Sequence, residues 1–510
     1  MSAARSCRGP GLFLAAIALG GLLSGCALSE ETRRSLRIRS SLGDEVDPDE
    51  FEDLLQFARD RHVRGAQADA GRALRQGFWL MLEGLDPADA ALSPPDRARL
   101  IAHAGESPRA CAEAVGMARD AWNAAWPARP MTWSDLAERT LQCIFPRLDP
   151  HSAWFPRSAW GDMARSMSGR YTGIGIVVQP GDEPMVSDVF EGGPADGVLR
   201  RKDRIVAVDG KPVKGLSTEV YLGMIRGEAG TDVRLSVRRG EEALDLTLTR
   251  REVKARAVRR RDAGRDRDVV VLGLWSYTDG SADEMEAALR REGRPPRGIV
   301  LDLRNNPGGT VDDAVAIVDL FIDTGVVITE RGHSTRVLEA EVDGAVLPPS
   351  VPIIVLLNRF SASASELTAG ALQDHGRAVL MGEATYGKGT VQEIYKLGDR
   401  GAKITVARFY LPAGRSTQLA GVSPDIPYPD AEAAKLEAAG LETFERDYDN
   451  ALPADAVSGE FRRSADPAPL LARLRGRLGT VAKPDTEIDE ADAMLQEAVR
   501  ILDSEGRAGE

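Results

Sequence analysis

Serine and lysine side chains in two segments rich in glycine and alanine are the groups of this sequence best suited to chemistry. Ser361, Ser363 and Ser365 alternate with alanine, and Lys388 lies between two glycines, 25 positions after the middle serine. A serine hydroxyl is a poor nucleophile without a base, and a lysine amine can be that base when burial lowers its pKa toward neutrality. Only nine of the 65 basic residues are lysines, and arginine could not act as a base because guanidinium stays protonated. A Ser-Lys pair is therefore one candidate for nucleophilic catalysis.

A Ser-His-Asp mechanism is disfavoured by the same residues. No Gly-x-Ser-x-Gly elbow surrounds these serines. His375 would lie about twelve residues down a helix from Ser363, or roughly 18 Å at helical rise, which is too far. The remaining histidines, His62, His103, His151 and His333, stand in no recognisable triad context.

Each candidate also has a structural interpretation. Ser363-x-x-Glu366 is a capping-box pattern, so the role of this serine could be limited to capping the start of a helix. Lys388 could be a lysine of a surface loop, and Gly308 could be a turn glycine. Gln392, four residues after Lys388 in an expected strand, would face the same side and could orient the amine by hydrogen bonding.

The elements that must position these groups form an alternating pattern from Val269 to Asp425, with strands followed by helical stretches. This order predicts a largely parallel sheet with crossovers. The runs 298–303 and 352–357 are almost continuously apolar, as in strands buried on both faces. Gly308-Gly309, the serine cluster and the segment 386–389 all follow such strands. Because ligands bind at the carboxyl ends of parallel strands, we expect the three segments to converge on one site.

Two flanking regions have other patterns. Residues 51–165 carry apolar residues at helical spacing and are interpreted as packing helices. Residues 166–250 are short β runs broken by glycine, in an order that resembles a PDZ domain. The charge-dense stretch 251–268 is interpreted as a solvated connector, and residues 431–510 as a polar helical extension without a motif.

Beyond these patterns, the chain resembles the C-terminal processing (tail-specific) proteases over about residues 140–430. The segments that carry the resemblance are Asp149-Pro150-His151-Ser152, the PDZ-like region, 302–309, 359–366, 371–374, 382–392 and 416–426. The resemblance implies Ser363 as nucleophile, Lys388 as general base and Gln392 as supporting residue. It also implies an oxyanion hole formed by the backbone N–H groups of Gly308 and Ala364. Helix-opening amides such as that of Ala364 are unpaired and carry partial positive charge.

In PDZ domains a glycine-rich loop turns backbone N–H groups toward the terminal carboxylate of a peptide, which then adds a strand to the sheet. The resemblance places that loop here at Tyr171, Gly173, Ile174, Gly175 and Ile176.

The expected fold class is multidomain α+β, with an N-terminal helical region, a PDZ domain, an α/β (ClpP/crotonase-like) protease core and a helical C-terminal tail. The expected boundaries are 1–26 for a lipoprotein signal peptide, 27–165 for a tether and helical region, 166–253 for the PDZ domain, 254–430 for the serine peptidase core and 431–510 for the extension. The length of 510 residues accommodates several domains.

Composition excludes several classes of partner and site. The net charge of −13 makes nucleic acid an unsuitable partner, since phosphate binding needs a clustered positive field. The four cysteines are too few for a disulfide scaffold and lie at no zinc spacing. We therefore expect no metal and no cofactor. Cys111 and Cys143 could pair in an oxidising compartment or could be two separate thiols.

The N-terminus indicates export. Arg5 and Arg8 precede a short apolar run that ends in Leu23-Ser24-Gly25-Cys26, which resembles the bacterial lipobox. The resemblance implies lipidation of Cys26, and Ala27 after it favours the outer membrane over inner-membrane retention. We expect a lipoprotein of the bacterial cell envelope that faces the periplasm.

The sequence thus predicts an envelope serine endopeptidase that binds C-terminal tails of proteins through its PDZ domain and cleaves them with a Ser-Lys dyad. Family analogy adds a possible helical-repeat lipoprotein as adaptor. The alternative is a non-catalytic PDZ adaptor or scaffold lipoprotein on a protease fold, and intact Ser363, Lys388 and Gln392 argue against it.

Overall fold

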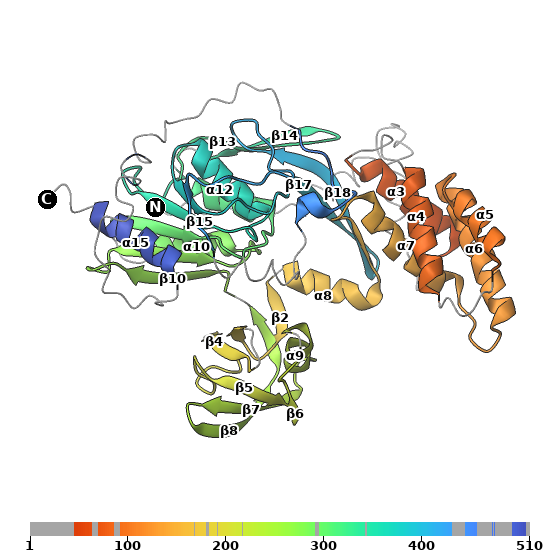
Figure 1. The fold of residues 1–510 in the computed structure, drawn as a ribbon, viewed down its shortest axis with the longest axis horizontal. Coiled ribbons are helices and arrows are strands. Elements are labelled where there is room, and N and C mark those ends of the chain that lie inside the picture. The colour runs from red at the N-terminus through yellow and green to blue at the C-terminus, as the bar shows by residue number, and fades with distance from the viewer. Residues whose placement is uncertain are drawn as a thin grey trace, which may run out of the picture. The chain divides into compact units, whose positions relative to one another are not determined.

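The computed structural model of the chain describes most residues from 45 to 430 and shorter stretches nearer the C-terminus (Figure 1). The described residues are 45–63, 70–85, 92–167, 169–179, 183–190, 192–216, 218–254, 256–290, 295–341, 344–430, 444–455, 472, 474 and 492–505. The expected signal peptide, its Cys26 and most of the tether lie outside them. Of the helices in the described ranges, none combines the length and the apolar character needed to cross a membrane.

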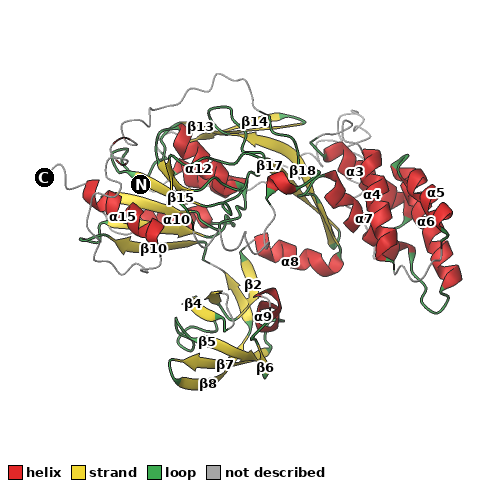
Figure 2. Cartoon of the chain, viewed as in Figure 1, coloured by secondary structure: helices red, strands yellow, loops and turns green. Residues whose placement is uncertain are grey.

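The chain divides into two compact units. One comprises residues up to Arg147 together with Tyr395–Ala402, and the other comprises Leu148–Ile394 and Lys403 onward. The chain is a multidomain α+β protein, as predicted (Figure 2).

The first unit is built of amphipathic helices. They are α3 (Pro48–Arg61), α4 (Ala70–Gly84), α5 (Pro94–Ala104), α6 (Pro108–Ala125) and α7 (Trp133–Leu148). Helix α3 begins at a capping box in which Asp47 accepts from the Glu50 N–H, and Pro48 occupies its first turn. Phe57 of α3 packs edge-on against Tyr395 at a ring separation of 4.9 Å. Cys111 and Cys143 are free thiols, and burial raises the pKa of Cys111 to about 12.

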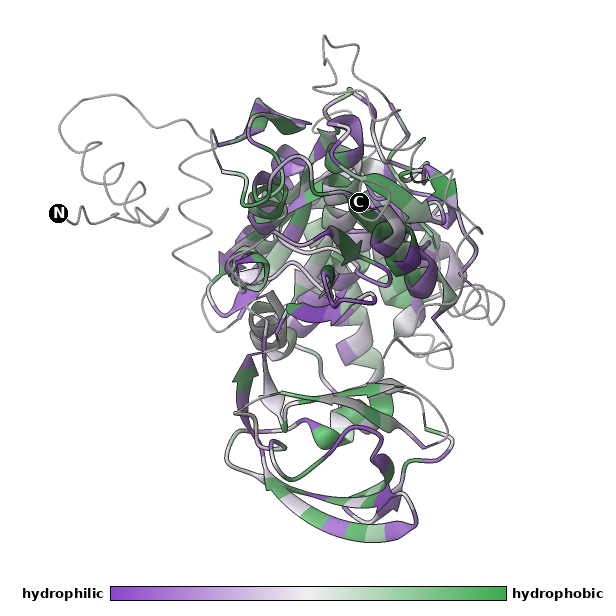
Figure 3. Cartoon of the chain, turned by 90° about the vertical axis from the view of Figure 1, so that its left-hand side faces the viewer, coloured by the Kyte–Doolittle hydropathy of each residue, from purple (hydrophilic) through white to green (hydrophobic). Residues whose placement is uncertain are grey.

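The PDZ-like region folds as a small β structure with one helix. Its strands are β2 (Arg170–Gly173), β3 (Ile176–Gln179), β4 (Met185–Val189), β5 (Arg204–Val208), β6 (Lys211–Pro212), β7 (Asp232–Arg239), β8 (Glu242–Thr249) and β9 (Arg251–Lys254), and its helix is α9 (Thr218–Ile225). The sheet order is β3-β4-β5-β7-β8, with β6 on β5, and β2 pairs with β9. Alternating polar and apolar bands are visible on its lowermost strands in Figure 3. Val233, Leu235 and Val237 of β7 are the buried members of that alternation.

A second sheet lies within the predicted core region 254–430 and has the order β10-β11-β12-β15-β16-β19. Its strands are β10 (Val258–Ala263), β11 (Val269–Leu274), β12 (Gly298–Asp302), β15 (Ile353–Leu357), β16 (Val379–Gly382) and β19 (Ile426–Pro427). All neighbours are parallel except β10 and β11. Every residue of β15 is buried, in agreement with its continuous apolar run. Four helices of the described residues pack against this sheet: α10 (Ser281–Leu289), α11 (Val311–Asp319), α12 (Ala364–Asp374) and α15 (Ala493–Glu505).

A further, mostly antiparallel sheet was not predicted. It has the order β1-β18-β13-β14, with β17 also paired to β18. Its strands are β1 (Ala153–Phe155), β13 (Gly325–Gly332), β14 (Thr335–Ala340), β17 (Thr390–Leu397) and β18 (Arg400–Tyr410), and helix α8 (Arg157–Met167) follows β1. Strand β1 pairs with a strand about 250 positions away, which no local pattern reveals.

The interpretation of residues 251–268 as a solvated connector was wrong. Strands β9 and β10 lie within it, and Arg259, Arg260 and Arg261 pair in register with Gly273, Leu272 and Val271 of β11. Long arginine stems can cover apolar surface while their charged ends reach polar partners, so the charge density concealed an edge strand. Here the Arg260 guanidinium donates to Asp262 at 2.9 Å.

The C-terminal extension contributes to the core where it is described. Met494, Leu495, Ala498, Val499 and Leu502 of α15 are buried in one cluster with residues of β11, β12, β15 and β16. The predicted helical character holds for α15, whereas residues 444–455 contain only a short 3-10 turn, η2 (Glu445–Asp447).

Candidate active site

Ser363 stands at the turn between β15 and α12, directly before the first residue of the helix. Its φ of +55° lies in a region that side chains other than glycine rarely adopt, so the turn holds local strain at this residue. Ser361 and Ser365 are fully buried, and their hydroxyls donate to the carbonyls of Leu303 at 2.9 Å and Asn306 at 3.0 Å. Of the three serines, only Ser363 is partly exposed. The flanking serines therefore hold the loop, and the middle one is left accessible to a substrate.

The Glu366 carboxylate joins the serine turn to the lysine loop. One of its oxygens, Oε2, accepts from the backbone N–H of Ser363 at 2.7 Å and from that of Lys388 at 2.9 Å. The other, Oε1, accepts from Gly387 N–H at 2.8 Å and from the Thr385 hydroxyl at 2.6 Å. Two segments 25 positions apart thus meet on one oxygen atom, as the expected convergence at the sheet edge requires.

Burial determines the protonation of this carboxyl. Glu366 has no solvent exposure, and desolvation raises its pKa to about 7 although all four donors act in the opposite direction.

The capping-box interpretation of Ser363-x-x-Glu366 is correct for the glutamate, whose carboxylate accepts from the Ser363 N–H. Capping does not exclude catalysis, because this contact uses the serine backbone rather than its hydroxyl.

The Lys388 amine lies among polar side chains next to β17. The residue is only partly exposed, and desolvation lowers the pKa of its amine to about 8, with the nearby Lys403 acting in the same direction. The amine donates to Gln392 Oε1 at 2.7 Å. The Gln392 amide in turn donates to Thr390 Oγ1 at 2.9 Å and to Thr405 Oγ1 at 3.2 Å. A lysine with this pKa is neutral often enough near pH 8 to accept a proton.

The two expected oxyanion-hole residues lie side by side. A Cβ atom built on Gly308 would come within 2.9 Å of the Ala364 amide nitrogen and of the Ser363 Cβ, and the φ of +97° at Gly308 also requires glycine. The Gly308 N–H donates to Asn306 Oδ1 at 2.8 Å in this structure. The structure therefore brings both backbone segments to the nucleophile, with the Gly308 donor already paired.

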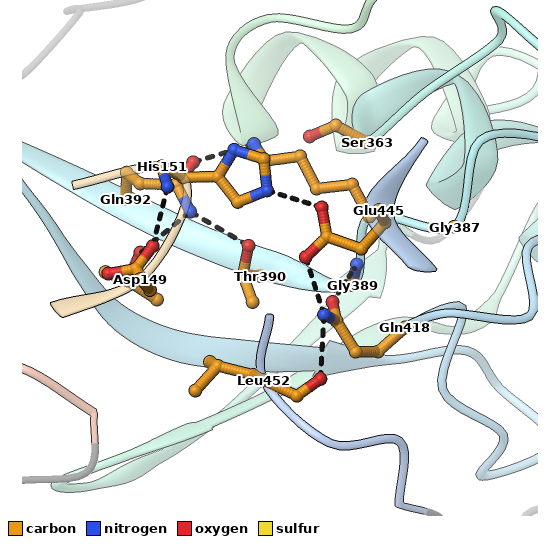
Figure 4. A network of polar contacts seen from close by, with 12 residues as sticks. Asp149, His151, Ser363, Gly387, Gly389, Thr390, Gln392, Gln418, Glu445 and Leu452 are labelled. Carbon is orange, nitrogen blue, oxygen red and sulfur yellow. Dashed lines mark hydrogen bonds and ion pairs between the residues drawn. The ribbon is translucent and has the colours of Figure 1, made fainter. Parts of the chain in front are cut away.

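A second buried carboxylate comes from the C-terminal extension (Figure 4). Glu445 is fully buried and contacts His151 Nε2 and Gln418 Nε2, each at 2.6 Å. Gln418 Oε1 accepts from the N–H of Gly389, the residue after Lys388, at 2.8 Å. The charge of Glu445 acts to raise the Lys388 pKa, against desolvation. This segment of the extension is thus part of the environment of the lysine.

The PDZ loop residues occupy different environments. Ile174 is buried in the domain core, and its carbonyl accepts from Ala195 N–H at 2.8 Å. The Tyr171 ring packs near Phe190, with ring centroids 6.4 Å apart. Burial raises the Tyr171 pKa to about 12, and the backbone N–H groups of Gly175 and Ile176 act on its hydroxyl in the opposite direction. By geometry, the buried Tyr171 hydroxyl has no hydrogen-bond partner among the described residues.

Sequence reasoning missed Glu366 as a link between the loops, and it missed Glu445, Thr405 and Gln418. The sequence assigns Glu366 a role only as a helix cap, although a glutamate three residues after a candidate nucleophile was a usable signal. Glu445 lies 294 positions from His151 in a stretch without a recognised motif, so no signal pointed to it.

Two family models match parts of the chain. The model of peptidase family S41 matches residues 268–428, and that of the PDZ domain matches residues 185–239. A carboxy-terminal-processing protease of Bartonella bacilliformis is 36% identical over 302 residues, covering 57% of this chain and 69% of that protein. A probable CtpA-like serine protease of Staphylococcus aureus is 33% identical over 284 residues, covering 54% and 57%.

Among solved structures, the photosystem II D1 C-terminal processing protease aligns with 28% identity and a TM-score of 0.37. The alignment covers 63% of this chain and 96% of that one.

Proposed function

This chain belongs to peptidase family S41, and we propose that it is a serine endopeptidase with Ser363 as nucleophile and Lys388 as general base. The observation that carries the proposal is the Glu366 oxygen that accepts from the N–H groups of both residues. A strained, partly exposed serine and a lysine of lowered pKa, whose backbone N–H groups share one carboxylate oxygen, are the two groups that hydroxyl activation needs.

In the proposed reaction the neutral Lys388 amine takes the proton of the Ser363 hydroxyl as its oxygen attacks the scissile carbonyl carbon. The lysine then gives that proton to the leaving amide nitrogen, the C–N bond breaks and an acyl-enzyme ester remains. Water then loses a proton to the same amine and attacks the ester carbon. The bond from that carbon to the Ser363 oxygen breaks, and the lysine returns the proton to this oxygen. Gln392 holds the amine, and the amides of Gly308 and Ala364 would stabilise the oxyanion once Gly308 N–H turns from Asn306. Such a donor is typically worth about 3 kcal/mol of barrier.

The substrates we propose are proteins with exposed C-terminal tails, bound through the PDZ domain. A tail would add a strand beside β3 and direct its carboxylate at the loop Gly173–Ile176. The PDZ family match over residues 185–239 supports the proposal.

We also propose that the protein is a lipoprotein of the bacterial envelope, attached through Cys26 to the outer membrane and facing the periplasm. The support is the basic start, the apolar run and Leu23-Ser24-Gly25-Cys26. A helical-repeat lipoprotein adaptor is a proposal from family analogy. Metabolic labelling with a fatty acid tests the anchor, since Cys26→Ala should remove the label.

The decisive experiment is degradation of unstructured casein, with and without an apolar C-terminal tag, by the chain from residue 27. Lys388→Ala should abolish cleavage in a protein that remains folded. Lys396→Ala is the matched control, since Lys396 is an exposed lysine of the same strand region with no place in the site. Cleavage that survives Lys388→Ala would refute the dyad. No cleavage by the parent, with tail peptide present, would favour the non-catalytic PDZ scaffold.

A further inference from the structure

The turn Asp149-Pro150-His151-Ser152, at the end of α7, has no role in the mechanism above. The Asp149 side chain is 1% exposed, so its carboxylate is almost entirely removed from water. It accepts from the His151 N–H at 2.8 Å, from the Ser152 N–H at 3.1 Å and from the Ser152 hydroxyl. These three bonds are local and close the turn.

A fourth bond of Asp149 is not local. Its Oδ1 also accepts from the hydroxyl of Thr405, 256 positions away on β18, at 2.8 Å. The same Thr405 oxygen accepts from the Gln392 amide nitrogen at 3.2 Å, and Gln392 Oε1 accepts from the Lys388 amine at 2.7 Å. A continuous chain of hydrogen bonds therefore joins Asp149 to the general base. Figure 4 shows Asp149 near Gln392, with Ser363 on the opposite side of the view and joined to the network by no drawn contact.

The Asp149 carboxylate at the end of this series of hydrogen bonds fixes the donor and the acceptor of each bond in it. A carboxylate can only accept, so the Thr405 hydroxyl has to donate its single hydrogen to Asp149. The Thr405 oxygen is then available to Gln392 only as an acceptor, which requires the Gln392 NH₂ group on that side. The carbonyl oxygen of the same amide is consequently turned toward Lys388.

Without the carboxylate, the Thr405 hydroxyl could donate to Gln392 Oε1 instead. The amide could then flip and present its NH₂ group to the amine, and two donors would face each other. A lysine that donates one N–H to Gln392 Oε1 keeps its lone pair free for the Ser363 proton. The orientation of one amide therefore decides whether the base is correctly directed.

We propose that Asp149, acting through Thr405, is a positioning residue that fixes the Gln392 amide and thereby the direction of the Lys388 amine. The proposal rests on the Ser-Lys chemistry above and extends it to a turn from the distant N-terminal part of the chain. The local bonds of Asp149 close the turn, whereas its bond to Thr405 joins the turn to β18. The Thr405 N–H also donates to the Ser152 hydroxyl at 3.2 Å, so the turn stays joined to β18 when the Thr405 hydroxyl is removed.

Substitutions at Thr405 test the proposal and leave in place the local hydrogen bonds by which Asp149 closes the turn. Thr405→Val keeps the shape of the side chain and removes the hydroxyl, while Thr405→Ser keeps the hydroxyl and removes a methyl group. The matched control is Thr329→Val on β13, which pairs with β18. Thr329 is 2% exposed, and its hydroxyl has no hydrogen-bond partner among the described residues.

The assay is the pH dependence of kcat and KM on casein with an apolar C-terminal tag. For Thr405→Val we expect kcat to fall about tenfold with KM within about twofold. The acidic limb of the kcat profile should also move to lower pH, because a lysine ammonium without its fixed acceptor deprotonates more easily. Thr405→Ser should recover kcat to within about twofold of the parent, and Thr329→Val should leave both the rate and the profile unchanged.

Three results would overturn the proposal: a Thr405→Val enzyme that behaves as Thr329→Val does, a lower kcat with an unmoved acidic limb, or a Thr405→Ser enzyme as slow as Thr405→Val. Failure of the Ser-Lys mechanism itself would give another result. The Lys388→Ala enzyme would then still cleave casein, regardless of the residue at position 405. Asp149→Asn in the Thr405→Val background completes the test. The Asp149 charge also acts directly to raise the Lys388 pKa, so the comparison is made on the alkaline plateau of kcat. If Asp149 positions the amide through Thr405, the second substitution should change this plateau by less than about twofold.

Discussion

The enclosed amine of Lys388 should make the folded protein less stable than it would be with a neutral residue at the same position. Lys388→Met keeps a side chain of similar length and removes the charge. Burial lowers the Lys388 pKa from 10.5 to about 8, so the unfolded chain binds this proton more tightly than the folded chain. The lysine therefore costs stability below pH 8, and this cost disappears as the pH rises through about 10.5.

The pKa difference gives the size of the effect. At pH 7 the penalty is about 3 kcal/mol, and at pH 9.5 it falls to about 1 kcal/mol. The substitution also removes the bond to Gln392 Oε1, at a cost of about 1 kcal/mol. We therefore expect Lys388→Met to be more stable than the parent by about 2 kcal/mol at pH 7 and roughly equal to it at pH 9.5.

Urea unfolding of the two proteins at both pH values measures this difference through the shift in midpoint. The same variant should be inactive on casein, so stability would rise as function is lost. Lys396→Met controls for the removal of an exposed lysine. A variant that is destabilised equally at pH 7 and pH 9.5 would refute the claim that the amine is held in a desolvated pocket.

Three further predictions follow from the same contacts. Cleavage should rise about tenfold per pH unit below about pH 8 and level off above it, because only the neutral Lys388 amine accepts the Ser363 proton; a flat profile from pH 6 to 9 would contradict this. Glu366→Gln should lower kcat on tagged casein by about 10- to 100-fold, since an amide cannot accept from all four donors and leaves a buried N–H unpaired; kcat within twofold of the parent would count against the shared carboxylate. Gly308→Ala should abolish cleavage because its Cβ would lie 2.8 Å from a backbone oxygen at a positive φ, whereas Gly240→Ala, also at positive φ but with open space around it, should cleave normally.

Much of the fold was predictable because its signals are local. The continuous apolar runs at 298–303 and 352–357 indicated the parallel strands β12 and β15. The antiparallel sheet could not be predicted in the same way, since β1 reaches β18 from about 250 positions away. The edge strand β10 was obscured because partners of its arginines come from elsewhere in the folded chain, such as the Ala288 carbonyl that accepts from Arg260 at 2.6 Å.

The sequence by itself determined which residues are chemically competent: a serine among alanines, a lysine between glycines at a defined spacing, and a glutamine four positions on. Tertiary structure alone decided how they are held. Ser363 and Lys388 meet on one Glu366 oxygen, and Asp149 orients Gln392 through Thr405. Glu445 reaches the lysine loop through Gln418. The physical reason is that nucleophile and base types are properties of side chains. The pKa and direction of each group depend on burial and on hydrogen-bond partners drawn from segments up to about 290 residues apart.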